Sequence, residues 1–314
     1  MTPVVAGIDC GTNSVRLLVA APVADDSGAP TRLVDLDRRM QIVRLGQRVD
    51  RTGRLDPAAL ERTFAALRDY ADVMHDLGVT ATRMVATSAS RDASNAADFV
   101  AGVRDILGIE PQVISGHEEA ALSYRGATAG VADDLAPSPR LVVDIGGGST
   151  EVVLGEGASV VASRSVDVGC VRMTERHLAS DPPSADEVAR TVADIDAALA
   201  LAGESVPLAQ ARSLVGLAGS VTTVAAIHLG LAEYDSAAIH GHVVPADDVR
   251  AISDDLLHMT RDERAAIGVM HPGRVDVIGA GALVLRRVLD VTGLPEVVVS
   301  EHDILDGIAW SLLE

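Results

Sequence analysis

The chain has 314 residues, of which 48% are hydrophobic and only 2% are aromatic, and its formal net charge is −19. This length predicts two domains and a large core built from Ala, Val, Leu and Ile. The scarcity of rings argues against single-stranded nucleic acid binding, which relies on base stacking, and the negative charge argues against DNA and anionic membranes as partners.

Strand-like apolar runs alternate with helical patterns along the chain, which favours an α/β fold. In the first half, strands are predicted at residues 4–9, 15–21, 33–43, 83–87 and 112–115. A helix is predicted after the N-cap Asp56, with Pro57 in its first turn and an end at Gly78. Two further helices are predicted, one at 95–107 and one that begins at Gly116 or His117.

The second half begins after residues 132–139, a stretch with two Asp and two Pro that is the predicted linker. Strands are predicted at 141–145, 151–154, 160–166 and 297–299, and helices at 186–201, 221–228, 246–258, 275–289 and 304–313. The sequence therefore predicts an N-terminal domain at 1–130 and a C-terminal domain at 131–314, with a ligand cleft between them. The closing segment 303–314 is a candidate to pack back on the first domain.

Two loops share one sequence pattern, in which an apolar run leads to Asp, with Gly two residues later and Ser five residues later. They are Asp9-Cys10-Gly11-Thr12-Asn13-Ser14 and Asp144-Ile145-Gly146-Gly147-Gly148-Ser149. Glycine lets a backbone approach a ligand and point its N–H groups at it. A turn in an ordinary hairpin would explain either loop alone, but two matching loops favour a clamp around a phosphate chain. The predicted phosphate-binding residues are Gly11, Thr12, Asn13, Ser14, Gly146, Gly147, Gly148 and Ser149.

Three carboxylates accompany these loops and are the predicted metal site: Asp9, Asp144 and Glu151. Mg²⁺ suits them because it takes few carboxylates and keeps several waters. Mg²⁺ is therefore the expected cofactor, with Mn²⁺ as an alternative. For Glu151, an exposed carboxylate on a strand is an equal alternative to ordering a water near the metal. Arg16, which follows the first loop, is equally explained as a solvated residue on a strand face.

A helix is predicted to open at Ser115-Gly116-His117-Glu118-Glu119-Ala120. Acidic side chains in a first turn are favoured by the helix dipole, and this explanation suffices for Glu118. Glu119 lies at the predicted hinge between the domains, where its carboxylate could accept a proton from water that attacks a terminal phosphorus. It is the predicted general base.

Arg91 lies in Thr87-Ser88-Ala89-Ser90-Arg91-Asp92, directly after a predicted strand. Hydroxyl groups and an Arg at the carboxyl end of a strand can reach a ligand in a cleft, and Arg91 could neutralise charge on the phosphoryl group during transfer. Capping of the next helix by Ser94 or Asn95 is the alternative explanation of this segment, although it does not account for Arg91.

Further along the chain, Gly219 and Ser220 are predicted to bind phosphate, because small residues lead from a strand into a helix N-terminus at 216–220. Tight packing between that strand and helix is an equal alternative. His240 and His242 are interpreted as turn and packing residues, since no third metal ligand accompanies them. Arg274 and Asp276 are expected to form a structural ion pair or a wall of the cleft.

Cys10 and Cys170 stand far apart with no neighbouring Cys, which indicates reduced thiols. No His lies near Cys10 in the sequence, so a catalytic thiol is not expected. All 26 basic residues are Arg, so anion binding must use guanidinium groups, and no lysine chemistry is available. No apolar run of bilayer-spanning length and no signal peptide is recognisable, so a cytoplasmic location without membrane binding is expected.

Taken together, these motifs resemble the exopolyphosphatase/guanosine pentaphosphate phosphohydrolase family of the actin-like ATPase superfamily. The matching stretches follow one another in order at 7–16, 86–91, 115–120, 143–151, 216–222, 274–278 and 299–307. The resemblance implies a duplicated actin-like (ribonuclease H-like) fold with an interdomain cleft. It also implies Mg²⁺-dependent hydrolysis of the terminal phosphate of polyphosphate or guanosine pentaphosphate. By this resemblance Glu119 is the general base. The residues that match the family's phosphate and metal site are Asp9, Asn13, Ser14, Arg91, Asp144, Gly146, Ser149 and Glu151.

Longer members of that family carry further helical domains, and this chain resembles the short form. Its basic residues concentrate only within 32–54, so short to medium polyphosphates or a nucleotide are the expected substrates. Two alternatives stay open: a small-molecule kinase on the same fold, and a non-catalytic nucleotide-binding switch or filament. A homodimer is one candidate oligomeric state.

Overall fold

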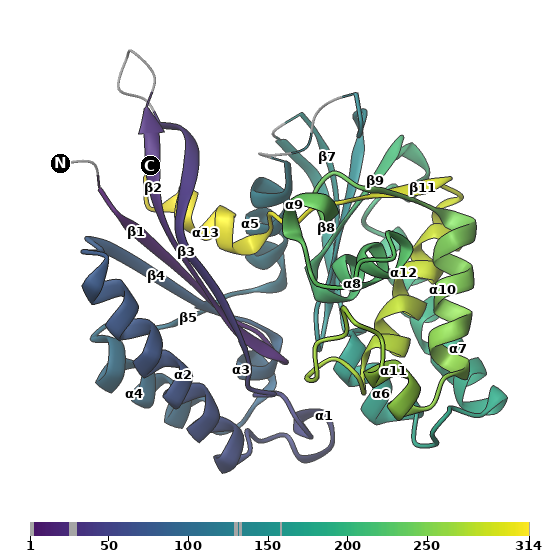
Figure 1. The fold of residues 1–314 in the computed structure, drawn as a ribbon, viewed down its shortest axis with the longest axis horizontal. Coiled ribbons are helices and arrows are strands. Elements are labelled where there is room, and N and C mark those ends of the chain that lie inside the picture. Colours follow the sequence, from purple (N-terminus) through teal and green to yellow (C-terminus); the bar gives the residue numbers. More distant parts are fainter. Residues whose placement is uncertain (1–2, 25–29, 129–130, 132–133, 158, 314) are drawn as a thin grey trace. The chain divides into compact units, whose positions relative to one another are not determined.

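The computed structural model describes residues 3–24, 30–128, 131, 134–157 and 159–313. The chain forms two compact units: unit 1 comprises Met1–Gly126 and Ile304–Glu314, and unit 2 comprises Ala127–Asp303 (Figure 1). The predicted domain boundary at 130 and the first residues of the predicted linker, 132–133, lie outside the described residues.

Unit 1 is built on a five-stranded sheet with the order β3-β2-β1-β4-β5. Its strands are β1 (Val5–Cys10), β2 (Ser14–Ala24), β3 (Pro30–Ile42), β4 (Ala81–Ala86) and β5 (Gln112–Val113). β1, β2 and β3 are antiparallel neighbours, whereas β4 runs parallel to β1 and β5 runs parallel to β4. Because parallel strands end at the same edge of a sheet, the segments that follow β1, β4 and β5 meet there.

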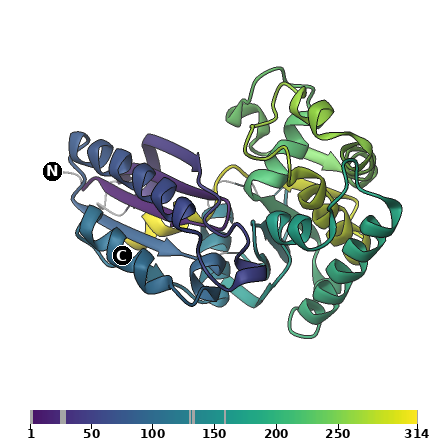
Figure 2. The ribbon, with the colours of Figure 1, turned by 90° about the horizontal axis from the view of Figure 1, so that it is seen from below.

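Helices cover both faces of this sheet (Figures 1 and 2). They are α1 (Val49–Thr52), α2 (Pro57–Asp76), α3 (Ser88–Asp92), α4 (Ala96–Leu107), α5 (Gly116–Thr128) and α13 (Ile304–Ser311). Successive side chains of β1 point to opposite faces of the sheet. Ile8 packs in one core with α2 and α4, whereas Val5 packs with Leu305 of α13 on the other face. Gly7 permits that second contact, because a Cβ there would stand 3.0 Å from the Leu305 carbonyl oxygen.

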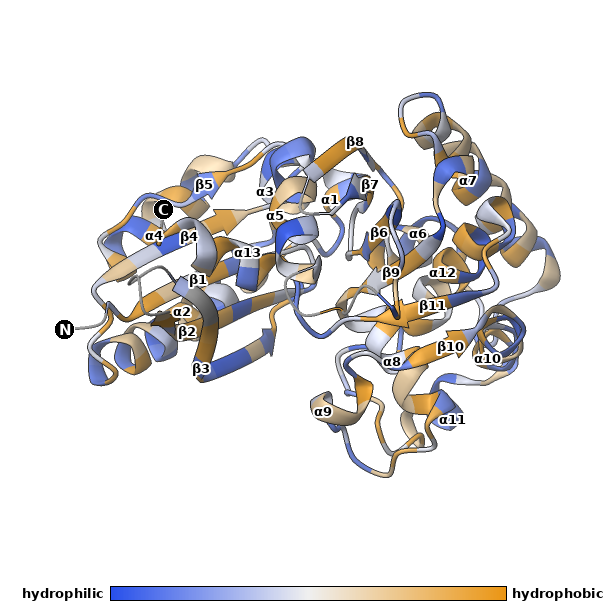
Figure 3. Ribbon diagram, turned by 90° about the horizontal axis from the view of Figure 1, so that it is seen from above, coloured by the Kyte–Doolittle hydropathy of each residue, from blue (hydrophilic) through white to orange (hydrophobic). Residues whose placement is uncertain are grey.

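Unit 2 contains a six-stranded sheet with the order β10-β11-β9-β6-β7-β8. Its strands are β6 (Arg140–Ile145), β7 (Thr150–Glu156), β8 (Ser159–Val166), β9 (Ser213–Leu217), β10 (Val243–Pro245) and β11 (Glu296–Val299). The series β8-β7-β6-β9-β11 repeats the order and the strand directions of β3-β2-β1-β4-β5 in unit 1. The predicted duplicated α/β fold is therefore confirmed. β11 is hydrophobic after its first residue, Glu296, whereas the outer strand β3 carries a hydrophilic stretch, as edge strands commonly do (Figure 3).

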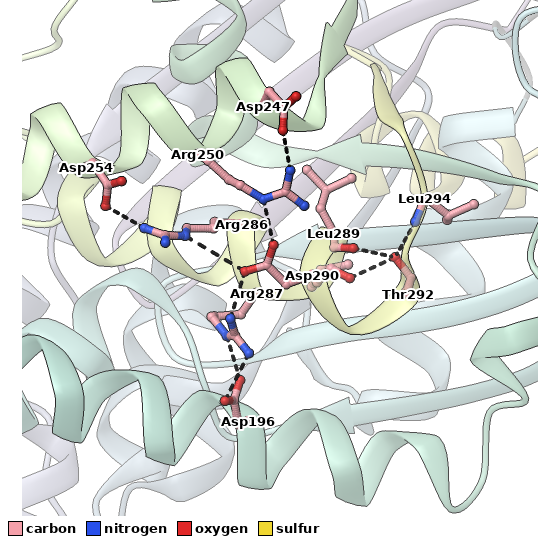
Figure 4. A network of polar contacts seen from close by, with 11 residues as sticks. Asp196, Asp247, Arg250, Asp254, Arg286, Arg287, Leu289, Asp290, Thr292 and Leu294 are labelled. Carbon is pink, nitrogen blue, oxygen red and sulfur yellow. Dashed lines mark hydrogen bonds and ion pairs between the residues drawn. The ribbon is translucent and has the colours of Figure 1, made fainter.

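The helices of unit 2 share one large core with its sheet. They are α6 (Cys170–His177), α7 (Ala185–Gly203), α8 (Ala218–His228), α9 (Ser236–Ile239), α10 (Ala246–His258), α11 (Arg261–Ala265), α12 (Ile278–Thr292) and the short 3-10 helix η1 (Leu208–Gln210). On the polar side of α12, Asp290 accepts from Arg250 Nε of α10 at 2.8 Å and from Arg287 Nη1 at 2.7 Å (Figure 4). Arg287 Nε also donates to Asp196 of α7 at 2.7 Å, so one ionic network joins three helices (Figure 4).

Most predicted elements recur with shifted ends. α10 has the predicted bounds, and Asp56 caps α2 by accepting from Ala58 N at 2.8 Å. α12 begins at Ile278 rather than at 275, because a turn precedes it in which Val277 N donates to Arg274 O at 2.9 Å. α6 was not predicted. No helix in the described part of the chain is long and apolar enough to cross a lipid bilayer.

Candidate active site

The first glycine loop closes the β1–β2 hairpin at the edge of the unit 1 sheet where the parallel strands end. Gly11 N donates to Ser14 O at 2.9 Å. The carbonyl oxygens of Thr12 and Asn13 accept three main-chain N–H groups from the segment 43–46, at 2.8–3.0 Å. The loop is therefore held from one side by a segment that the sequence did not identify as its support.

Two side chains of this loop, those of Asp9 and Asn13, have defined surroundings. Arg16 donates from Nε and Nη2 to Asp9 Oδ2 at 3.0 and 2.6 Å, so Arg16 offsets the charge of a buried carboxylate and is not a solvated strand residue. The Oδ1 atom of Asn13 is buried and has no hydrogen-bond partner among the described residues. A buried acceptor without a partner is costly, and it marks a place where a donor such as a bound water would be accommodated.

The two predicted catalytic residues lie together in unit 1. Arg91 is on α3, directly after β4, and Glu119 is in the first turn of α5, just after β5. Arg91 Nη1 donates to Ile114 O at 2.9 Å and to Glu119 Oε2 at 3.4 Å. The Glu119 side chain is 9% exposed and that of Arg91 is 29% exposed, so a nearly buried carboxylate stands beside a partly accessible guanidinium.

These residues and the first loop belong to one sheet edge. Thr87 N, at the start of the Arg91 segment, donates to Cys10 O at 3.2 Å. Ile114 N, at the start of the Glu119 segment, donates to Ala86 O at 3.1 Å. β1, β4 and β5 therefore lead into three adjacent segments that hold predicted site residues.

The proposed capping of α4 by Ser94 or Asn95 is wrong. Asn95 occupies the N-cap position, but its side chain makes no capping hydrogen bond. Its Oδ1 instead accepts from Leu55 N at 2.8 Å, and Ser94 Oγ donates to Gly53 O at 2.9 Å. Both side chains fasten the segment before α2, which is distant in sequence.

The second glycine loop repeats the geometry of the first one in unit 2. Gly146 N donates to Ser149 O at 3.0 Å, as Gly11 N does to Ser14 O. The start of α6 binds the loop carbonyls: Cys170 N donates to Gly146 O at 3.0 Å, and two further main-chain N–H groups of α6 donate to Gly147 O at 2.9 and 3.0 Å.

This arrangement directs a row of amide groups to the opposite side of the loop. The loop peptide bonds are trans, so each N–H points away from the carbonyl that precedes it. With the carbonyls held by α6, the N–H groups of Gly147, Gly148 and Ser149 point away from α6. None of these three groups donates a hydrogen bond within the described part of the chain. Successive unused N–H groups are available to hydrogen-bond an anion, so the predicted phosphate-binding role of this loop stays a prediction.

Asp144 and Glu151 face each other directly across the β6–β7 hairpin. They are 7% and 1% exposed, so Glu151 is not the exposed strand carboxylate of the alternative interpretation. Ser165 Oγ donates to Glu151 Oε1 at 2.7 Å. Like charges opposite each other destabilise a strand pair, and a divalent cation would offset them.

The two hairpins differ in charge at this matched position. Asp9 faces Arg16, whereas Asp144 faces a second carboxylate, so the chemistry of the donors in unit 2 fits a hard cation better. Two carboxylates completed by waters suit Mg²⁺. Within the described ranges, no three His, Cys, Asp or Glu side chains gather as a protein-only metal cage. The metal roles of Asp9, Asp144 and Glu151 stay predictions, as does the closing of both loops on one ligand.

The segment between β9 and α8 is tightly packed. A Cβ at Gly219 would lie within 2.2 Å of Arg274 Nη2, so the guanidinium rests directly on this glycine. Arg274 Nη1 also donates to Thr223 Oγ1 at 3.2 Å, while Asp276 pairs with Arg261 at 2.8 Å. Arg274 therefore contributes a cation at the predicted phosphate segment.

Ser220 is linked to the second glycine loop through Cys170. Both side chains pack on Gly281, where a Cβ would stand 2.1 Å from Ser220 Oγ and 3.2 Å from Cys170 Cβ. The residues predicted around 146 and around 220 thus meet at the start of α6. Ser220 has a packing role that the sequence offered only as an alternative.

Both thiols are buried and unsuited to nucleophilic catalysis. Burial raises the pKa of the Cys170 thiol, although Ser220 and Arg274 partly oppose this effect. Burial and the nearby Asp9 carboxylate raise the pKa of the Cys10 thiol well above its ordinary value. The thiolate is disfavoured at both positions.

The remaining sequence features have structural partners. His240 stacks against His302 with ring centroids 4.5 Å apart, and His242 Nε2 lies 2.8 Å from His228 Nδ1, so the two His residues do not converge on one site. In the basic tract 32–54, Arg38 pairs with Asp306 at 2.7 Å and Arg39 with Asp37 at 2.7 Å. Part of this tract is therefore already neutralised.

Comparisons with known proteins agree with this geometry. The model of the Ppx/GppA phosphatase family matches residues 23–314. Exopolyphosphatase 2 of Mycobacterium tuberculosis (strain CDC 1551 / Oshkosh) is 49% identical over 320 residues, which cover 98% of each chain.

Solved structures show the same relationship. A crystal structure of an exopolyphosphatase-like protein is 42% identical, with a TM-score of 0.93 and 98% of each chain covered. The Ppx/GppA family member of Aquifex aeolicus is 29% identical, with a TM-score of 0.79, covering 100% of this chain and 98% of that one. The two repeated sheets are those of the duplicated actin-like fold, and the chain belongs to the Ppx/GppA phosphatase family.

Proposed function

We propose that the protein is an exopolyphosphatase, which releases the terminal orthophosphate from short to medium chains of inorganic polyphosphate. Guanosine pentaphosphate, converted to the tetraphosphate, is the second proposed substrate. Membership of a phosphatase family and similarity to a protein named exopolyphosphatase 2 support a hydrolase of this class.

The observation that carries the proposal is the contact between Arg91 and Glu119 at the sheet edge that also holds the first glycine loop. Glu119 has the role of general base: it orients a water molecule and takes its proton as the water attacks the terminal phosphorus in line with the leaving oxygen. Arg91 offsets the charge that develops on the transferred phosphoryl group. Its contact with Ile114 O holds the guanidinium in place beforehand.

The glycine loops have the role of holding the substrate. The N–H groups of Gly147, Gly148 and Ser149 bind phosphate oxygens, and the hydroxyl and amide side chains of the first loop add donors. Asp144 and Glu151 are the proposed ligands of Mg²⁺ or Mn²⁺, and Asp9 is proposed as a metal ligand as well. Such an ion, when bound, supplies positive charge that polarises a phosphoryl oxygen and offsets the substrate's negative charge.

One panel of reactions tests this function. Polyphosphates of several lengths, guanosine pentaphosphate and ATP are each incubated with Mg²⁺, and free phosphate is measured, with a chelator in parallel samples. Release from polyphosphate that the chelator suppresses is the expected result. Transfer of phosphate from ATP to a sugar or carboxylate acceptor, without release from polyphosphate, would instead establish the kinase alternative.

A further inference from the structure

Three consecutive glycines cannot by themselves keep the N–H groups of the second loop pointing in a fixed direction. Glycine adopts many backbone conformations, so each peptide plane from 146 to 149 could rotate and turn its N–H away from a ligand. Fixing such planes only when the ligand binds would cost affinity. The loop therefore needs an external hold on its carbonyl groups, and the structure contains one.

Arg172 on α6 holds two consecutive carbonyls of the loop. Its main-chain N donates to Gly147 O at 3.0 Å, and its side-chain Nε donates to Gly148 O at 2.6 Å. The outer end of the guanidinium lies 3.9 Å from an Asp167 oxygen, and the Arg172 side chain is only 14% exposed.

The side-chain contact is the one that matters for Ser149. The Gly148 carbonyl and the Ser149 N–H belong to the same trans peptide, so a donor that holds one fixes the direction of the other. The Nε contact is also charge-assisted, which makes it stronger than a hydrogen bond between neutral groups. No other hydrogen bond to the Gly148 carbonyl occurs within the described part of the chain.

We propose that Arg172 is a positioning residue of the phosphate site: its Nε locks the Gly148–Ser149 peptide so that the Ser149 N–H stays turned toward the phosphate. This inference rests on the proposed function of the glycine loop and extends it to a residue outside the loop. Arg172 acts through the loop backbone and does not need to touch the substrate.

Two substitutions separate this role from that of a simple positive charge. Arg172→Gln keeps an N–H donor the same number of bonds from the backbone as Nε, but removes the charge. Arg172→Met has a similar length and no donor. If Arg172 positions the peptide, the Gln variant retains clearly more affinity than the Met variant.

The experiment measures binding of tripolyphosphate by calorimetry and kcat/KM for phosphate release, with the folded state checked by thermal unfolding. Arg172→Met is expected to lose about tenfold to a hundredfold in both quantities, as for a hydrogen bond to a charged donor, and Arg172→Gln to lose only about threefold to tenfold, because its neutral donor makes a weaker bond. Arg176→Met is the matched control, because Arg176 lies on the same helix but pairs with Asp194 at 2.8 Å.

Any other outcome contradicts either the positioning role of Arg172 or the proposed hydrolase activity. Equal losses in the Gln and Met variants would make Arg172 a charge contact and overturn the positioning role. So would a Met variant that binds like the wild type. Binding of tripolyphosphate by the wild type without phosphate release would rule out the proposed hydrolase activity. The affinities of the variants would still test the role of Arg172. Absence of binding in the wild type would overturn both.

Discussion

Arg91 Nη1 lies 3.4 Å from Glu119 Oε2, although the two residues are 28 positions apart in the chain. The contact exists because β4 and β5 are parallel neighbours and deliver the residues that follow them to the same sheet edge. The carboxylate proposed to accept a proton and the guanidinium proposed to offset phosphoryl charge therefore lie in contact.

Glu119→Gln should lower kcat by about 10² to 10⁴, the usual contribution of a general base, because the amide cannot take a proton from water. Affinity for tripolyphosphate should change by less than about threefold, since the substitution preserves shape. Phosphate release and calorimetry measure the two effects. Glu118→Gln is the matched control: Glu118 is the preceding residue of the same helix turn, and its exposed carboxylate pairs with Arg83 at 2.7 Å. If the Glu119→Gln enzyme kept more than a tenth of the wild-type kcat, Glu119 would not be the general base.

Arg91→Lys should also lose activity, although it keeps a positive charge. The Arg91 guanidinium reaches the Ile114 carbonyl and the Glu119 carboxylate from one nitrogen and leaves its other nitrogens for a phosphate, which a single ammonium cannot do. The expected loss in kcat is about 10² to 10³, as for removal of a preorganised donor at a developing charge. Arg104→Lys serves as the control, because Arg104 is exposed and pairs with Glu110 at 3.0 Å. Equal activity of wild type and Arg91→Lys would show that charge alone suffices.

The features that could be predicted from the sequence are those that depend on residues close together in the chain. Runs of apolar residues located most strands, and the repeated Asp-x-Gly pattern located both hairpin loops. Their matched closing hydrogen bonds at Gly11 and Gly146 agree with that repeat. The N-cap at Asp56 and the bounds of α10 followed from capping and periodicity in the same way.

What supports the loops could not be read from the sequence, because it depends on contacts between distant segments. The helix α6 has mostly polar residues and no long apolar pattern, and its first N–H groups are satisfied by carbonyls of the loop at 146–147. Segment 43–46 supports the other loop through its main chain, which leaves no signature in residue type. The side chain of Asn95 was misassigned for a similar reason, since its partner is Leu55.

Gly169→Ala should disturb the phosphate site without touching it. A Cβ at Gly169 would lie 2.5 Å from the Gly147 carbonyl oxygen and 2.7 Å from Gly148 N, and both are backbone atoms that can yield only if the loop moves. We expect a loss of about 1–3 kcal/mol in the free energy of unfolding and weaker tripolyphosphate binding, measured by urea titration and calorimetry.

The control is Gly203→Ala, at the end of α7. There a Cβ would meet its nearest neighbour, in Leu208, at an ordinary 3.7 Å, and the added methyl favours the helix. This variant should be as stable as the wild type or slightly more stable. If Gly169→Ala binds tripolyphosphate as tightly as Gly203→Ala does, the second loop is not the phosphate site.

We expect the Glu187 carboxylate to make the stability of unit 2 vary with pH in the acidic range. Its carboxylate accepts hydrogen bonds from the main-chain N–H groups of Ser184 at 2.8 Å, Ala179 at 3.0 Å and Ser180 at 3.1 Å, in a capping box at the start of α7. These bonds, that of Ser184 foremost, lower the pKa of Glu187 to about 2. In the unfolded chain the pKa returns to about 4.3.

The sign of the effect follows from proton linkage. Between pH 4.3 and 2, the unfolded chain binds a proton at Glu187 that the folded chain does not, so stability falls as the pH falls. Above about pH 4.3 the full contribution is present. The urea midpoint of the wild type should therefore exceed that of Glu187→Gln near neutral pH, and the difference should shrink steadily as the pH approaches 2. Glu204→Gln, which changes an exposed residue just after the same helix, should show no such trend. A difference between wild type and Glu187→Gln that stays constant from pH 6 to pH 2.5 would mean that these hydrogen bonds do not favour the ionised carboxylate.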